Sequence, residues 1–245
     1  MLTFLINLDT AGERRERMQA QLDAVGVHVE RVGIDLREHG EADVHDWTNR
    51  HFPHLRFDLA AICAAEAGCW ASHLVAWRGL AQRGEAACTV IEDDILLAQG
   101  FGDAVSMLTA QRPFDVIYLG TSSKNISTRR RTRIGELWVH EPVGVIFNTW
   151  GYVITREYVQ RFFASDPMWI DMPIDHFLGG RAKSLKPRIG VLRPAIVTED
   201  PAVGPRSQIQ PYATRIDRHR VWQEARRAIL GSRLSDVYYS LYKWL

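Results

Sequence analysis

The first 35 residues of the chain constrain its fold more than any other stretch. The runs "LTFLINL" (residues 2–8) and "VHVERVGID" (residues 27–35) are short and rich in strand-forming residues. Between them, "GERRERMQAQLDAVG" places Met18 and Leu22 at helical spacing and ends at Gly26, a residue type that often terminates helices. A strand, a helix and a strand in this order predict a βαβ unit, whose two strands pair in parallel.

Polar residues follow both strands of this predicted unit. Open α/β sheets bind their ligands outside the carboxyl ends of the strands. Side chains there can hold the base and ribose of a nucleotide through amide and carboxylate hydrogen bonds. The residues expected at these positions are Asn7, Leu8, Asp9 and Asp35.

Three consecutive carboxylates end the next apolar run, "AACTVIEDD" (residues 86–94). Adjacent acids repel each other, and a bound cation would offset that repulsion. Mg²⁺ and Mn²⁺ take oxygen ligands and use only one or two protein carboxylates. We therefore expect Asp94 to bind the metal of a metal-bridged diphosphate, while Asp93 or Glu92 reaches a sugar or ribose hydroxyl. The alternative is a helix N-terminus at which acids gather against the helix dipole.

The rest of the chain alternates predicted helices and strands. Helices are expected over residues 58–83, 101–111, 156–163 and 172–183, and strands over residues 114–120, 137–147, 150–155 and 188–197. Gly68 marks either a break in the first of these helices or a close approach of other groups. Two polar segments, residues 36–57 and 122–135, are expected to be a solvated irregular loop and a mobile loop.

Composition excludes several classes of protein. A formal net charge of +1 argues against a general nucleic-acid binder. The three cysteines form no CxxC pair, which favours a reduced compartment. Charged residues appear within the first nine positions, too early for a signal peptide. These features predict a cytoplasmic protein that at most lies on the surface of the inner membrane.

Four motifs together resemble the family 25 glycosyltransferases, the lipooligosaccharide-type galactosyltransferases related to collagen galactosyltransferases. They are "INLDTAGERRERM", "EAGCWASHLVAW", "VIEDDILL", and "WGYVITREYVQRFF" followed by "PIDHFL", in that order over roughly residues 1–180. One departure is "FNTWGY", where the family pattern leads us to expect a Gly-Thr-type lead-in.

The resemblance implies an α/β fold, a single GT-A-like domain with a mixed, mainly parallel central sheet flanked by helices. It also implies a UDP-sugar donor, commonly UDP-galactose, inversion at the anomeric carbon, and a lipid-linked or protein-linked glycan acceptor. We expect the domain over residues 1–210, with a nucleotide-binding half (about 1–120) and an acceptor-side half (about 121–210). Residues 211–245 are expected to form a helical, basic and aromatic extension.

Three further residues receive roles with an alternative each. Asp175 is the expected catalytic base, since Pro173 can begin a helix there, but it also fits a first-turn helix acid. Arg14 either reaches a phosphate or is an exposed charge on the first helix. His73 either binds donor phosphate or ribose, or orients the acidic loop, or is a hydrogen-bonded packing histidine.

Two basic segments bear on the acceptor. "TRRRTR" (residues 128–133) is either a solvated loop or a contact for an anionic acceptor such as phosphorylated lipopolysaccharide core. Residues 213–245 hold seven basic and three acidic side chains, with apolar residues at helical spacing. This segment either lies on the anionic inner leaflet, or closes the protein's own core, or forms a dimer interface.

The sequence thus predicts a metal-dependent (Mn²⁺ or Mg²⁺) inverting glycosyltransferase for lipopolysaccharide or lipooligosaccharide core. The alternative is a noncatalytic nucleotide-sugar-binding or scaffold protein of the same fold. A phosphoacceptor receiver domain is disfavoured, because its acids follow the first strand, whereas here about 90 residues of α/β pattern come first.

Overall fold

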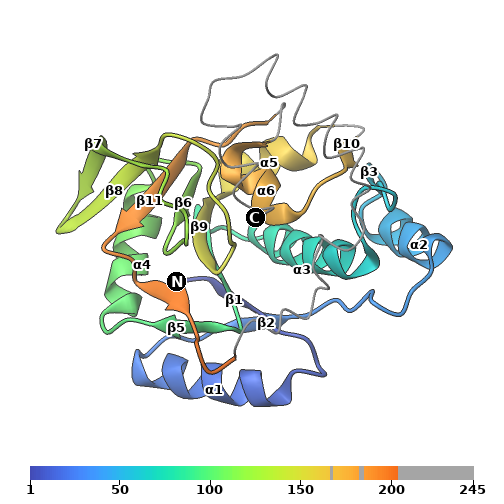
Figure 1. Ribbon diagram of the computed structural model, residues 1–245, viewed down its shortest axis with the longest axis horizontal. Coiled ribbons are helices and arrows are strands. Elements are labelled where there is room, and N and C mark those ends of the chain that lie inside the picture. Colours follow the sequence, from blue (N-terminus) through green and yellow to red (C-terminus); the bar gives the residue numbers. More distant parts are fainter. Residues whose placement is uncertain (166–167, 182–184, 204–245) are drawn as a thin grey trace. The chain divides into compact units, whose positions relative to one another are not determined.

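An eight-stranded sheet forms the centre of the protein (Figure 1). The computed structural model describes residues 1–165, 168–181 and 185–203. Across the sheet the strands are β2 (Glu30–Val32), β1 (Thr3–Ile6), β4 (Ala87–Glu92), β9 (Gly151–Thr155), β6 (Val116–Tyr118), β11 (Ile189–Arg193), β8 (Leu137–Pro142) and β7 (Ile126–Ile134).

The strands of this sheet run in both directions. β1 is parallel to β2 and β4, and β6 is parallel to β11. β9 is antiparallel to both β4 and β6, and β8 is antiparallel to β11 and β7. The βαβ unit and the mixed α/β fold are confirmed, but only three of these seven pairings are parallel, so the expectation of a mainly parallel sheet needs correction. β9 is buried along its whole length, and a fully buried strand has the same apolar pattern in either direction.

Helices cover both faces of the sheet and create two hydrophobic cores. One face packs against α3 (Ala64–Ala81) and α5 (Arg156–Phe163), and the other against α1 (Gly12–Ala24) and α4 (Phe101–Gln111). Successive strand residues point to opposite faces, so Val90 belongs to the first core and Ile91 to the second. The apolar runs of the central strands are therefore buried on both sides.

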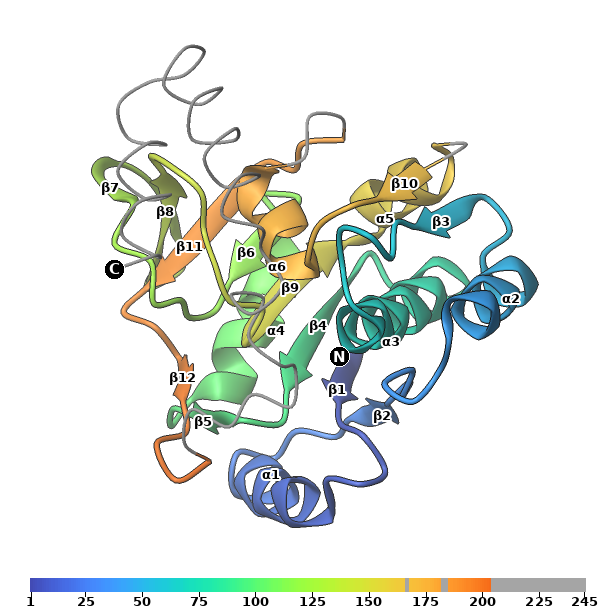
Figure 2. The same ribbon diagram turned by 45° about the vertical axis from the view of Figure 1, so that its right-hand side comes forward.

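Residues 36–57, expected to be irregular, form a helix and a strand instead. α2 (Glu41–His51) precedes β3 (Leu55–Phe57), which pairs in parallel with β10 (Met168–Ile170) beside α2 and α3 (Figure 2). Only Val44 and Thr48 of α2 are buried. Tertiary packing of this short apolar face stabilises α2. The rest of the helix is polar, so its sequence does not show helical periodicity.

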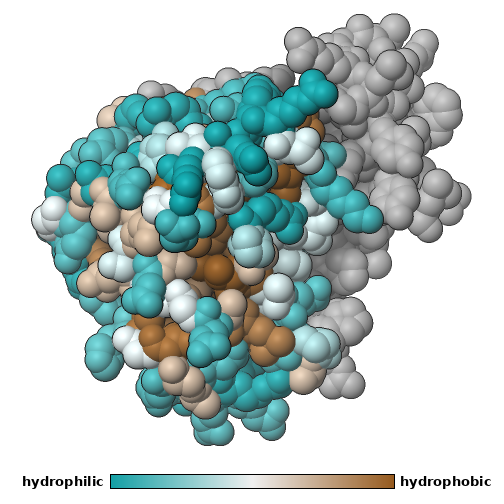
Figure 3. Space-filling model, turned by 90° about the vertical axis from the view of Figure 1, so that its left-hand side faces the viewer, coloured by the Kyte–Doolittle hydropathy of each residue, from teal (hydrophilic) through white to brown (hydrophobic). Residues whose placement is uncertain are grey.

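The expected mobile loop at 122–135 is also wrong, because most of it is strand β7, paired with β8 in a hairpin. Six consecutive residues of β7 are exposed, and the guanidinium carbon of Arg131 lies 4.1 Å from the centroid of the Trp138 ring. Figure 3 views this side of the molecule and shows hydrophilic residues over much of it. An edge strand in which only the last residue is buried lacks the apolar alternation that identifies strands.

The remaining predicted elements are found with shifted ends. Of the helix expected over residues 58–83, only α3 is helical, and its helix runs unbroken through Gly68. A Cβ at Gly68 would lie 2.9 Å from the carbonyl oxygen of Ile34, so this glycine marks a close approach. The helix predicted at 172–183 is α6 (Ile174–His176) followed by the wider turn η1 (Phe177–Arg181).

A short antiparallel pair completes the described fold. β5 (Ile95–Leu97) follows the carboxylates and pairs with β12 (Val197–Glu199), which brings the chain after β11 back to the acidic segment. None of the described helices is long and apolar enough to cross a bilayer. The predicted extension at 211–245 lies outside the described residues.

Candidate active site at the ends of the central strands

The acidic segment lies where three central strands end at one edge of the sheet. Ile6 of β1 pairs with Glu92 of β4, so Asn7 and Asp93 leave the two parallel strands side by side. β9 is antiparallel, and its first residue, Gly151, pairs with Ile91. The residues just before β9 therefore reach the same edge as the residues just after β1 and β4.

Asp93 is held by two partners from the first βαβ unit. Asn7 Nδ2 donates to Asp93 Oδ2 at 2.7 Å and to the carbonyl oxygen of Ala11 at 3.1 Å. Arg14 Nη1 donates to Asp93 Oδ1 at 3.1 Å. The Arg14 and Asp93 side chains are 17% and 11% exposed, so solvent screens this ion pair little. Arg14 is therefore a partner of the acidic segment rather than a surface charge.

Asp94 is the residue of the acidic segment whose ionised carboxylate is poorly stabilised by its surroundings. Its Oδ1 is buried and accepts no hydrogen bond from the described residues. Burial, together with the negative charges of Glu92 and Asp93, raises the pKa of Asp94 to about 7, and Arg14 only partly offsets this. Its backbone is fixed, because its carbonyl oxygen accepts from the Asp200 amide at 2.8 Å.

Glu92 is held through one of its two carboxylate oxygens. Thr149 Oγ1 donates a short hydrogen bond to Glu92 Oε1. His73 Nε2, on α3, lies 3.5 Å from the same oxygen. The Glu92 side chain remains 22% exposed. The carboxylate is thus anchored on one side and partly open on the other.

The residue before Thr149 connects the acidic segment to Asp175. The Asn148 amide lies 3.5 Å from Asp175 Oδ2, a long hydrogen bond, so adjacent residues contact Glu92 and Asp175. The negative charges of Glu92 and Asp175 both raise the pKa of Cys69, after the larger effect of burial. Asp175 therefore belongs to the same site as the acidic segment, from which it is separated by about 80 positions in sequence.

Asn148, in the segment "FNTWGY" that departs from the expected Gly-Thr lead-in, has a left-handed backbone. Its φ is 70°, in the left-handed region that glycine adopts freely and asparagine tolerates better than most residues. Ser122 Oγ donates to Asn148 Oδ1 at 2.5 Å and fixes its side chain. Asparagine is thus compatible with the left-handed backbone found at this position.

The helical motif "EAGCWASH" is mainly structural. Glu66 Oε2 accepts from the Cys63 amide at 2.8 Å and caps α3. Ser72 Oγ accepts from the Ile34 amide at 2.9 Å and binds α3 to the segment after β2. Burial raises the pKa of the Cys69 thiol well above its usual range, which fits a core residue rather than a nucleophile.

His73 is fully buried. This position favours an orienting or packing role over direct contact with a donor. One of its ring nitrogens, Cys69 Sγ and a Glu92 carboxylate oxygen all lie within 4.8 Å of one another, so these three side chains could hold a metal ion. That set is distinct from Asp94, the ligand expected from the sequence.

The expected nucleotide contacts on the first βαβ unit are more exposed. The Asp9 side chain is 82% exposed and lies 2.6 Å from Arg31, and Asp35 pairs with Arg37 at 2.5 Å. Leu8 is half-buried beside them. Sequence reasoning missed Asn148 and Thr149 because their signal is weak: two polar residues directly before a buried strand, an arrangement also common in loops.

A family model described as glycosyltransferase family 25 (LPS biosynthesis protein) matches residues 1–178, most of the chain. The chain belongs to glycosyltransferase family 25. The resemblance inferred from the four motifs is therefore confirmed. The match ends at Leu178, the last residue of "PIDHFL", and includes every site residue predicted above.

Relatives within family 25 have different described activities. A glycosyltransferase 25 family member of Drosophila pseudoobscura pseudoobscura is 28% identical over 182 residues, which cover 71% of this chain and 29% of that protein. Procollagen galactosyltransferase 2 of Mus musculus is 27% identical over 188 residues, with the same two coverages. A Bos taurus protein described as a probable inactive glycosyltransferase 25 family member 3 is 26% identical over 183 residues, covering 71% of this chain and 30% of its own length. The chain spans less than a third of the length of these curated relatives.

Proposed function

We propose that this family 25 chain is a metal-dependent inverting glycosyltransferase that moves galactose from UDP-galactose to a glycan acceptor. The acceptor would be lipopolysaccharide or lipooligosaccharide core, reached in the cytoplasm or at the inner leaflet. Two descriptions support this reading: LPS biosynthesis for the family model and galactosyl transfer to procollagen for the mouse relative.

One observation carries the proposal: Asp94 has a buried carboxylate oxygen that accepts no hydrogen bond from the described part of the chain, next to two further acids. Leaving such an oxygen unpaired costs free energy, and its proton is retained up to about pH 7. A divalent cation would replace that proton and satisfy the oxygen. Carboxylate oxygens suit Mg²⁺ and Mn²⁺, so the residues fit the expected cofactor.

The acidic segment divides the donor-binding work among its side chains. Asp94 would hold the Mn²⁺ or Mg²⁺ ion, which supplies Lewis-acid stabilisation to a departing diphosphate. Glu92, anchored through Oε1, presents Oε2 to a donor hydroxyl. Both carboxylate oxygens of Asp93 already accept hydrogen bonds, from Asn7 and Arg14, so Asp93 would keep the segment in place. It would also accept a hydrogen bond from a further hydroxyl of the donor.

The nucleoside would lie along the end of the first βαβ unit. Asp35 and Asp9 are exposed enough for a ribose or base to reach them, in exchange for their present arginine partners. Leu8 directly precedes Asp9, and its Cα would lie 3.2 Å from a Cβ at Gly33, two positions before Asp35. Asn7 is 1% exposed and bonded to Asp93, so its contribution to nucleotide binding would be indirect.

Asp175 would act as the base. Its side chain is 25% exposed, and the Asn148 amide orients one of its oxygens. As the acceptor hydroxyl attacks the anomeric carbon, Asp175 takes the hydroxyl proton. The bond from that carbon to the diphosphate breaks, and its electron pair leaves with UDP. Attack opposite the leaving group inverts the anomeric centre.

A noncatalytic nucleotide-sugar-binding role is the second candidate. It is favoured by one observation, that a relative of similar identity is described as probably inactive. Such a protein would keep donor binding but would not need Asp175.

Calorimetric titration with UDP tests the first proposal. Binding is measured with Mn²⁺, with EDTA, and in the Asp94→Asn variant, with Asp46→Asn on an exposed part of α2 as the matched control. We expect binding that requires metal and is lost in Asp94→Asn but kept in Asp46→Asn. UDP-galactose hydrolysis and transfer to a core glycan are then measured on the same samples.

The outcomes separate the candidates. If UDP affinity is the same with Mn²⁺, with EDTA and in Asp94→Asn, the cation has no part in the proposed function. Metal-dependent binding without hydrolysis or transfer of any UDP-sugar would favour the noncatalytic role. No UDP binding at all would overturn the UDP-sugar proposal.

A further inference from the structure

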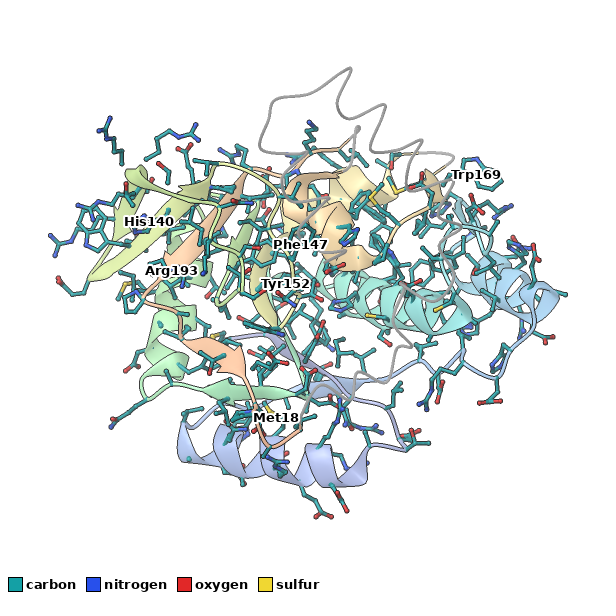
Figure 4. The ribbon with its side chains drawn as sticks, in the orientation of Figure 1. Met18, His140, Phe147, Tyr152, Trp169 and Arg193 are labelled. Atoms are coloured by element: carbon teal, nitrogen blue, oxygen red, sulfur yellow. The ribbon has the colours of Figure 1, made fainter. Side chains whose placement is uncertain are left out.

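A chain of buried polar groups connects α3 to the acidic segment. Trp77 Nε1 lies 2.9 Å from the hydroxyl oxygen of Tyr152, and that oxygen lies 2.7 Å from His73 Nδ1. The other ring nitrogen of His73 lies 3.5 Å from Glu92 Oε1. Trp77, Tyr152 and His73 are all fully buried, and Figure 4 shows Tyr152 inside the protein.

The hydrogens of this chain have one consistent arrangement. An indole N–H can only donate, so the Tyr152 oxygen accepts from Trp77. Burial raises the pKa of Tyr152, so its hydroxyl keeps its hydrogen. Among the described residues, His73 Nδ1 is the partner available to receive that hydrogen. His73 Nδ1 is then an acceptor, and its ring hydrogen is on Nε2, facing Glu92.

The opposite tautomer leaves two groups unsatisfied. With the hydrogen on Nδ1, the Tyr152 oxygen would accept twice, and its own O–H would have no acceptor among the described residues. The lone pair of His73 Nε2 would also face a carboxylate oxygen at 3.5 Å, which is repulsive in a buried setting. A metal ion on Cys69, His73 and Glu92 that was bound through Nε2 would need that same lone pair.

We propose that Trp77 and Tyr152 hold His73 as its Nε2–H tautomer, making His73 a positioning residue for Glu92. Thr149 then donates to Oε1, the Nε2–H group of His73 lies beside the same oxygen, and Oε2 is left to face the ligand. At 3.5 Å the histidine contact is an electrostatic restraint rather than a full hydrogen bond. The tautomer follows from the buried chain alone, whereas its effect on transfer rests on the proposed function.

The tautomer can be measured directly. Long-range nitrogen–proton correlation spectra of protein with isotope-labelled histidine distinguish the two neutral tautomers and the charged ring. His73 is assigned as the signal that disappears in His73→Gln. We expect the Nε2–H tautomer in wild type and its loss or averaging in Tyr152→Phe. A His73 signal of the Nδ1–H or charged form in wild type would overturn the proposal, as would a zinc-dependent change at this ring.

Activity measurements test the positioning role with matched controls from the same core. Tyr158 is a buried tyrosine whose hydroxyl bonds to the carbonyl of Leu185, away from the chain, so Tyr158→Phe controls for loss of a buried hydroxyl. We expect Tyr152→Phe to lower kcat by about tenfold with little change in KM, and Tyr158→Phe to change kcat little. Equal effects of the two variants would mean that the hydroxyl serves stability alone.

Substitutions of His73 supply a second comparison. The amide nitrogen of glutamine occupies nearly the place of histidine Nε2, and that of asparagine the place of Nδ1. His73→Gln should therefore keep several-fold more activity than His73→Asn. The reverse order would overturn the assignment. If wild type transfers no sugar, the proposed function fails, and the spectra still decide the tautomer.

Discussion

Ion pairs in two regions of the molecule differ in their exposure to solvent. In the acidic segment after β4, the paired Arg14 and Asp93 are 17% and 11% exposed. On the β7–β8 hairpin, the paired Arg130 and Glu141 are 59% and 43% exposed. Charge pairs shielded from water interact strongly and hold one geometry, whereas exposed pairs contribute little. The acidic segment is therefore preorganised, and the hairpin is a surface that can adapt to a partner.

The same comparison separates the two roles in the proposed function. A reaction site needs groups fixed before the ligand arrives, which the strand ends provide. Recognition of a large anionic acceptor tolerates adjustable arginines, which the hairpin provides. Substitutions in the acidic segment should thus have large effects, and substitutions in the hairpin small ones.

The largest expected effect is on catalysis. Asp175→Asn should lower the transfer rate by about a thousandfold, because the amide cannot take the acceptor proton. UDP binding should persist, since the amide that orients Asp175 belongs to the segment before β9, whereas the predicted nucleotide contacts lie on the first βαβ unit. Steady-state transfer and calorimetry on the same protein check both points. The exposed Asp171 supplies the control, and a loss in Asp171→Asn instead would move the base to that residue.

The second-largest effect is expected from a substitution that disturbs the backbone beside the acidic segment. A Cβ at Gly33 would lie 2.2 Å from the carbonyl oxygen of Asn7. Gly33→Ala should lower the free energy of unfolding by about 2 kcal/mol and displace the strand end that holds Asp93. Urea denaturation measures this. Gly12→Ala, where a Cβ meets nothing within 4 Å, should leave stability unchanged or raise it, and equal losses in both would contradict the prediction.

Asp94 should make the metal-free protein less stable as pH rises. Its pKa is raised to about 7 from 3.8, so between these values the folded state holds a proton that the unfolded chain releases. Stability therefore falls as pH rises through this range, and the loss is complete above about pH 7.

Asp94→Asn should abolish this loss. With EDTA present, we expect the variant to exceed wild type by about 2 kcal/mol at pH 8 and to differ little near pH 4. Denaturation curves at the two pH values decide this. Asp46→Asn should show no such gain, and a wild type with a flat profile would mean that Asp94 titrates normally.

The smallest effects are expected on the hairpin. Arg131→Gln removes the contact with the Trp138 ring and should change the free energy of unfolding by about 0.5 kcal/mol, with UDP binding unchanged. If the acceptor is anionic, its KM should rise, more at low salt than at high salt. A comparable variant, Arg129→Gln, tests whether the arginines act together. An effect on UDP binding would break the comparison between the two regions.

Local pattern was enough to predict the elements with strong periodicity. The helices α4 and α5 are predicted to the residue, because their apolar spacing meets the core directly, and the βαβ unit is predicted with strands longer than those observed. β7 and α2 are missed for the opposite reason: β7 has almost no buried side, and α2 has only two buried residues. Periodicity reports burial, so an element with little burial gives little signal.

For the site, the sequence by itself determined that its acidic residues follow the end of a strand; that they carry the chemistry stays a prediction. Glu92, Asp93 and Asp94 were predicted from their position after a buried strand. Their partners were decided only by tertiary structure. Thr149 and His73 meet Glu92 because β9 runs antiparallel beside β4 and α3 packs across the same face. Thr149 is 57 positions from Glu92 in the sequence, and His73 is 19 positions from it. Contacts over such separations depend on the order and direction of the strands in the sheet. The packing of the whole core sets that order.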